Sequence, residues 1–110
     1  MINLPQNDKR YSWTFHAKEK MEYYGISPSR VRRIVRKPTR VEEGIALNTV
    51  AAMQPAGTKR HQEIWVMYRT GRDKDNAKKI RIITAWRYPG ESPERNPVPL
   101  DILEDIKSLL

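Results

Sequence analysis

Two stretches with β-strand composition stand on either side of a short polar turn. Glu63–Thr70 (EIWVMYRT) and Lys79–Tyr88 (KIRIITAWRY) are rich in β-branched and aromatic residues, and Gly71–Ala77 (GRDKDNA) lies between them. This spacing predicts an antiparallel hairpin, and its first strand carries large residues on both faces. A hairpin of this kind must be covered by further elements, so it constrains the fold more than any other feature.

Two helices are predicted ahead of the hairpin. The first covers roughly 14–24, and Gly25 suits the position just beyond a helix C-terminus. The second begins at Ser27, an N-cap residue, followed by Pro28 at the first helical position. It ends before Pro38, because proline cannot continue a helix.

The rest of the chain supplies smaller elements. We expect an irregular lead-in over 1–11, and two short strands or one bent hairpin over 39–44 and 45–53. Four prolines make 89–99 a crossing segment or linker, and 99–110 predicts a last helix. The apolar residues of that helix that share one face are Leu100, Leu103, Ile106 and Leu110. The order predicts an α+β domain with helices against an antiparallel sheet.

Length and composition limit the class of protein. A chain of 110 residues supports one domain, which we assign to 1–110 with its core at about 12–88. The absence of cysteine excludes disulfides, thiolate metal sites and cysteine nucleophiles, and two histidines are too few for an all-histidine zinc site. No apolar run is long enough to span a bilayer, and no secretory signal is visible. We therefore expect a cytoplasmic protein with no membrane partner.

Positive charge is concentrated at the start of the chain. The whole chain carries +8, and residues 1–40 hold ten basic and three acidic side chains, whereas 89–110 hold two and five. This balance predicts one surface that binds a polyanion, with the acidic segment elsewhere or folded over it. If the segment covers the surface, deletion of 97–110 raises the affinity for RNA.

The second predicted helix carries most of this charge. No acidic residue stands between Ser27 and Arg40, and like charges one turn apart cost helix stability. Contacts with successive phosphates would explain the pattern, whereas the alternative is an ordinary solvated helix surface. The candidate nucleic-acid-binding residues of this helix are Arg30, Arg32, Arg33, Arg36 and Lys37.

Arginines of the hairpin are candidates for phosphate chemistry. Arg81 and Arg87 are six residues apart on one predicted strand, so we expect them on the same face, and pairing across the turn would bring Arg69 close to Arg81. Converging arginines can clamp a phosphate and stabilise charge that develops on it. The alternative is a ladder of solvated charges.

His16 and Lys20 stand one helical turn apart in the first helix. A neutral imidazole could take a proton from a ribose 2′-OH, with the lysine helping. The alternative, which the pattern alone favours, is a half-buried histidine hydrogen-bonded to the backbone. Trp86 and Tyr88 could stack on unpaired bases or pack in the core. No carboxylate cluster suited to Mg²⁺ is evident, so no metal or other cofactor is predicted.

Several of these segments resemble small uncharacterised RelE-like proteins of the RelE/ParE toxin superfamily, related to the BrnT toxins. Ile80–Trp86 (IRIITAW) resembles the R-I-I-S-A-R strand of the BrnT toxins, with Arg87 one position later than their arginine. The other similar segments, over 14–88, are Phe15–Ala17 with Lys20 and Met21, Gly25–Ser27, Val31–Val35, Pro38 and Trp65–Tyr68.

The resemblance implies two N-terminal helices packed on a twisted antiparallel sheet. It also implies a toxin of a toxin–antitoxin pair, an mRNA interferase that cleaves RNA without a metal through attack of the 2′-OH on the adjacent phosphate. His16 and Arg81 match family positions, and the resulting catalytic candidates are His16, Lys20, Arg69, Arg81 and Arg87.

The implied partners are RNA, including ribosome-bound mRNA, and an acidic antitoxin protein. A second copy of the chain is an open alternative, because the last helix has an apolar face. Two other functions also remain open. One is a nucleic-acid-binding domain without catalysis, and the other is a protein-interaction module built on the toxin fold.

Overall fold

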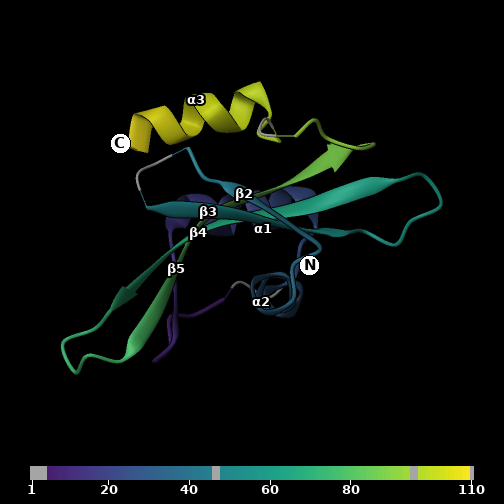
Figure 1. The fold of residues 1–110 in the computed structure, drawn as a ribbon. Helices are drawn as coiled ribbons and strands as arrows, with labels where there is room; N and C mark the ends of the chain where they lie inside the picture. The colour runs from purple at the N-terminus through teal and green to yellow at the C-terminus, as the bar shows by residue number, and fades with distance from the viewer. Residues whose placement is uncertain (1–4, 46–47, 95–96, 110) are drawn as a thin grey trace.

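The predicted hairpin forms the centre of the sheet (Figure 1). The computed structural model describes residues 5–45, 48–94 and 97–109. β4 (Gln62–Arg72) and β5 (Lys78–Pro89) are antiparallel neighbours throughout. The two predicted strands are therefore confirmed, and each extends further toward the turn than its apolar residues indicated.

Two shorter strands continue the sheet on one side of the hairpin. β3 (Thr49–Pro55) pairs antiparallel with β4, and β2 (Arg40–Glu43) pairs antiparallel with β3. This arrangement agrees with the two short strands expected over 39–44 and 45–53, of which residues 46 and 47 lie outside the described part.

The strand at the other edge was not expected. β1 (Tyr11–Trp13) pairs parallel with β5, which makes the sheet mixed, in the order β1-β5-β4-β3-β2. The prediction of a wholly antiparallel sheet is therefore wrong. The irregular lead-in is confirmed over the described residues 5–10 and ends one residue earlier than expected, because Tyr11 already belongs to the strand. Three residues are too few to show the alternation of a strand, and the partner of this strand is distant in sequence.

The two N-terminal helices begin and end where the sequence indicated. α1 (Phe15–Tyr24) starts at Thr14, whose Oγ1 accepts a 2.9 Å hydrogen bond from the backbone N–H three residues on, and ends at Gly25 with φ of 68°. α2 (Pro28–Arg36) is capped in the same way by Ser27 Oγ, at 3.1 Å. Both caps satisfy backbone donors that would otherwise lack partners.

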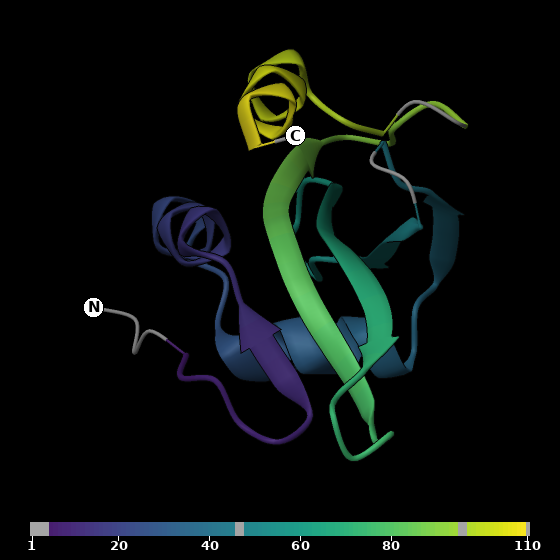
Figure 2. The same cartoon turned by 90° about the vertical axis from the view of Figure 1, so that its left-hand side faces the viewer.

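The helices surround the sheet on three sides. α2 lies on one face of the sheet, α3 (Leu100–Leu109) lies on the other, and α1 runs beside β5 (Figures 1 and 2). The predicted α+β class with a C-terminal helix is confirmed. In the part of the chain that the structure describes, no helix is long and apolar enough to cross a membrane.

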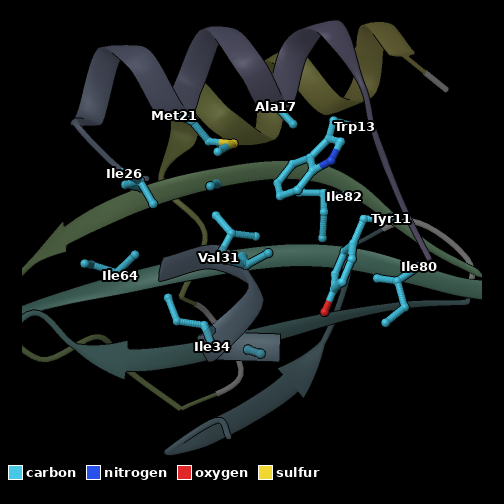
Figure 3. Close-up of a cluster of buried hydrophobic side chains, with 13 residues drawn as sticks. Tyr11, Trp13, Ala17, Met21, Ile26, Val31, Ile34, Ile64, Ile80 and Ile82 are labelled. Atoms are coloured by element: carbon cyan, nitrogen blue, oxygen red, sulfur yellow. The ribbon is translucent and has the colours of Figure 1, made fainter. Parts of the chain in front are cut away.

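One core cluster lies between the sheet and the N-terminal helices. Ala17 and Met21 of α1 and Val31 and Ile34 of α2 are fully buried there (Figure 3). The strands contribute to this first core Tyr11, Trp13, Ala52, Ile64, Val66, Ile80, Ile82 and Ala85.

A second core cluster lies beneath α3. The rings of Trp65 and Trp86 are parallel, with centroids 5.9 Å apart, and Ile102 and Ile106 of α3 are buried on this face of the sheet. The apolar face predicted for this helix is therefore partly wrong, because Leu100 is 70% exposed, and Leu110 lies outside the described residues. The helix covers the sheet with two isoleucines one turn apart, and these are not available to bind a second copy.

A β-bulge divides β5 into two halves. Met67 pairs with Thr84 but Tyr68 pairs with Ile82, so Ile83 is an extra residue with no partner in β4. A one-residue insertion reverses which side chains face each side of the sheet. The carbonyl of Ile83 accepts a 2.7 Å hydrogen bond from the Thr14 hydroxyl, so the bulge also fixes the start of α1.

The proline-rich segment after β5 is attached to the sheet through a buried carboxylate. Glu63 is 1% exposed, and its Oε1 accepts hydrogen bonds from Trp65 Nε1 at 2.9 Å and from the Ser92 backbone and hydroxyl. The Arg40 guanidinium donates to the carbonyls of Ser92 and Pro93. These contacts hold the described part of the crossing segment in place and so set the path toward α3.

Candidate functional site

A cleft of about 660 Å³ opens where α1 begins, between the β4–β5 hairpin and α3. It brings together three of the predicted catalytic residues, His16, Arg69 and Arg81. The other residues that line it are Asn7, Trp13, Thr14, Phe15, Glu19, Thr49, Ile83 and Ile106.

The two arginines of the cleft come from neighbouring strands. Arg69 of β4 is directly opposite Arg81 of β5, and Ser12 of β1 is opposite Arg81 on the other side. Arg81 Nη1 donates a 3.3 Å hydrogen bond to Ser12 Oγ. The predicted approach of Arg69 and Arg81 is therefore confirmed.

These guanidinium groups are not neutralised within the described chain. Arg69 and Arg81 are exposed, and neither forms an ion pair with a carboxylate among residues 5–45, 48–94 and 97–109. Like charges opposite each other in a sheet are destabilising. An anion bound between them would remove that repulsion.

His16 lies in the first turn of α1, on the wall of the cleft. Its Nε2 is enclosed and has no hydrogen-bond partner in the described part of the chain. Burial lowers the pKa of His16, Asp105 opposes this shift, Lys20 lowers the pKa further, and Glu19 again opposes it. A lowered pKa favours the neutral ring at pH 7, which is the form that can accept a proton.

Lys20 does not line the cleft. Its ammonium group pairs with Asp105 of α3 at 3.2 Å and lies 5.6 Å from the centre of the Tyr23 ring. The lysine joins α1 to α3, so the structure places it near His16 as a charge rather than as a group in contact with a ligand.

Arg87 lies outside the cleft, and the prediction that it shares a face with Arg81 is wrong. Its Nε donates a 2.6 Å hydrogen bond to the Tyr24 carbonyl, and Nη2 is 3.4 Å from the Gly25 carbonyl, at the end of α1. The bulge at Ile83 is the cause, because the extra residue turns every later side chain of β5 to the opposite face.

Phe15 is a site residue that the sequence reasoning missed. Its side chain is 77% exposed at the edge of the cleft. The sequence could have indicated this exposure through the angle between residues around the helix axis. Ala17 and Met21 define the buried face, and a residue two positions before Ala17 lies about 200° around the helix from it. An exposed aromatic ring that lines the same cleft as two arginines is suited to stacking on a base.

The other aromatic candidates belong to the second core. Trp86 is fully buried beneath α3, and its Nε1 donates a 3.0 Å hydrogen bond to the Pro97 carbonyl. Its predicted role in base stacking is therefore wrong, and the alternative of a core tryptophan holds. Tyr88 is partly buried against the same cluster.

The basic residues of α2 are on the face of the sheet opposite the cleft. Arg32 lies over the rings of Tyr11 and Trp13, at 5.7 and 5.5 Å, and Arg30 donates a 2.6 Å hydrogen bond to the Pro55 carbonyl. The remaining three side chains are exposed, those of Arg33, Arg36 and Lys37. The basic residues thus form two separate surfaces instead of the single one expected.

The acidic helix α3 does not cover α2, because the sheet separates them (Figures 1 and 2). It reaches the edge of the cleft, where Ile106 is a lining residue and Asp105 pairs with Lys20. Among the residues described, no group of three histidine, aspartate or glutamate side chains is arranged to hold a metal ion.

Comparisons with known proteins leave the chain without an assigned family. No family model matches it, and neither the curated proteins nor the solved structures include a significant match.

Proposed function

We propose that the chain is a metal-independent endoribonuclease that binds single-stranded RNA in the cleft. The observation that carries this proposal is the convergence of a histidine, two arginines without carboxylate partners in the described residues, and an exposed phenylalanine in one cleft. Burial lowers the pKa of the histidine, which favours its neutral form. These are the groups needed to accept a proton, stabilise a phosphorane and hold a base. We also propose that the helices and sheet have a RelE-like arrangement and that the protein is a toxin paired with an acidic antitoxin. This part of the proposal rests on the resemblance of the sequence motifs to RelE-like proteins.

In the proposed reaction, the ribose 2′-oxygen attacks the adjacent phosphorus while His16 accepts the 2′-OH proton. Because Nε2 is enclosed, we assign this transfer to Nδ1. The new bond joins the 2′-oxygen to phosphorus, and the bond from phosphorus to the 5′-oxygen breaks. Water protonates the leaving 5′-oxygen, and the resulting hydroxide takes the proton from His16. The products are a 2′,3′-cyclic phosphate and a 5′-hydroxyl.

Arg69 and Arg81 stabilise the charge that develops on the phosphorane oxygens. They are suited to this role because their strands are fixed in register and because Ser12 orients Arg81. Phe15 holds a flanking base at the edge of the cleft. Lys20, which is engaged by Asp105, tunes the pKa of His16 rather than donating a proton.

A cleavage assay tests this proposal. The protein is incubated with mixed-sequence single-stranded RNA in excess EDTA, both alone and with translating ribosomes, and product ends are identified. We expect cyclic phosphate ends, with cleavage lost in His16→Ala and Arg81→Ala. Lys74→Ala removes a charge from the exposed turn of the same hairpin and is the matched control. Absence of product under both conditions would contradict the proposal.

RNA binding without cleavage is the second candidate. The enclosed Nε2 of His16 favours it, because no described side chain orients the ring by a hydrogen bond. In that case the same cleft retains RNA in a salt-dependent way, and His16→Ala leaves the affinity unchanged.

A further inference from the structure

Three guanidinium groups line a second, smaller pocket, where α1 ends and α2 begins. The pocket has a volume of about 270 Å³, and its charged lining residues are Arg30, Arg33 and Arg87. No aspartate or glutamate is among the described residues that line it. Ile64 of its floor belongs to the first core, so the pocket is on the α2 side of the sheet and separate from the cleft.

Two of the three arginines are held by backbone carbonyls. Arg87 donates to the carbonyls of Tyr24 and Gly25, and Arg30 Nη2 donates to the Pro55 carbonyl. Carbonyl groups orient a guanidinium without neutralising its charge. The positions of Arg30 and Arg87 are therefore fixed, while their positive charges remain available to a ligand.

The positive charges in this pocket repel one another. Burial lowers the pKa of Arg30, and the charges of Arg33 and Arg87 lower it further. Arg30 Nε is also enclosed and has no hydrogen-bond partner in the described residues. The pocket thus holds three cations together, and none of the described residues that line it is an anion.

The start of α2 adds to the same field. Ser27, its N-cap, lines the pocket, and the N-terminal end of a helix carries partial positive charge. We propose that Arg30, Arg33 and Arg87 form a phosphate-binding site on the α2 side of the sheet. Bidentate hydrogen bonding by guanidinium groups matches the geometry of phosphate oxygens. This site does not depend on cleavage in the cleft. The phosphate group that it binds can belong to an RNA strand or can be free phosphate.

The test is a titration of the full chain with inorganic phosphate, followed by NMR of the arginine Nε–H groups. We expect saturable shifts at Arg30, Arg33 and Arg87. Arg33→Gln is the principal variant, because its side chain forms no hydrogen bond or ion pair among the described residues and is exposed. It should weaken binding by roughly tenfold. Arg72→Gln removes the same charge from the exposed end of β4, outside the pocket, and should leave binding unchanged.

A second titration distinguishes the two sources of phosphate. If a short single-stranded RNA displaces inorganic phosphate, and Arg33→Gln weakens the RNA as well, the site holds a backbone phosphate. If the RNA does not compete, the site serves free phosphate. Shifts that do not saturate, or equal effects of Arg33→Gln and Arg72→Gln, would overturn the proposal. The cleavage assay uses His16 and Arg81, so either proposal can fail alone.

Discussion

Arg69 and Arg81 face each other across the β4–β5 ladder, on the side of the sheet that carries the cleft. The pair is unusual because cross-strand neighbours of like charge destabilise a sheet. The chain keeps both arginines without a carboxylate partner in its described part. This relationship is the strongest physical reason to expect an anion in the cleft.

Arg69→Gln should therefore weaken RNA binding without weakening the fold. Loss of one phosphate contact lowers the slope of log affinity against log salt by about one unit. The free energy of unfolding should change by less than about 0.5 kcal/mol, because the side chain is exposed and a repulsion is removed. Fluorescence anisotropy at several salt concentrations and urea denaturation measure these quantities. An unchanged salt slope would remove Arg69 from the binding site.

Phe15→Ala should lower the affinity for single-stranded RNA by about 1–3 kcal/mol, the usual contribution of an aromatic ring stacked on a base. The thermal stability of the variant should hardly change, since the Phe15 ring is 77% exposed in the folded protein. Tyr23→Ala is a matched control, because Tyr23 is equally exposed on the same helix and does not line the cleft. Equal losses in the two variants would indicate a general surface effect and contradict a specific stack.

Asp105→Asn tests whether acidic helix α3 restrains RNA binding. The carboxylate pairs with Lys20 at the edge of the cleft, so its removal should free one cation and raise RNA affinity by roughly two- to threefold at low salt. Deletion of 97–110 is a poorer test, because it also removes Ile102 and Ile106 from the second core. Glu104→Gln, on an exposed position of the same helix, controls for the change in net charge. Equal gains in both variants would count against a specific role of Asp105.

Glu63 should make the fold sensitive to acid. Burial raises the pKa of Glu63, but hydrogen bonds from Ser92 and Trp65 and the charge of Arg40 outweigh it, so the folded pKa is below the ordinary value of 4.5. Its contribution to stability is therefore present above pH 4.5 and is lost as the pH falls through the folded pKa.

Glu63→Gln should cost about 1–3 kcal/mol at pH 7, because charge-assisted hydrogen bonds are weakened. Urea denaturation between neutral and acidic pH checks both effects. We expect the stability difference between wild type and variant to shrink at low pH. A difference that stays constant across the range would show that ionisation of Glu63 does not contribute.

Local signals predicted most of the secondary structure. Ser27 and Pro28 define the start of α2 in the sequence, and its Ser27 cap is present in the structure. The β-branched and aromatic composition of the hairpin strands likewise predicted β4 and β5. Helix caps and strand composition depend on residues that are neighbours in the sequence, so they can be predicted without knowing the tertiary structure.

Features that depend on distant partners were not predicted. β1 is a strand only because the edge of β5 accepts it, and Trp86 is buried because α3 crosses over it. The bulge at Ile83 has no local signature, yet it decides that Arg81 lies in the cleft and Arg87 in the second pocket. The sequence therefore predicted which types of residue form the site, but it predicted only part of their arrangement in space.

Binding of RNA in the cleft is tested most directly by NMR chemical-shift mapping with a short single-stranded RNA. We predict the largest backbone and side-chain shifts at Phe15, His16, Arg69 and Arg81. Arg33 and Arg87 should respond as a separate cluster if the second phosphate site is occupied by the same strand. Shifts confined to α2, or none at the four cleft residues, would contradict the account.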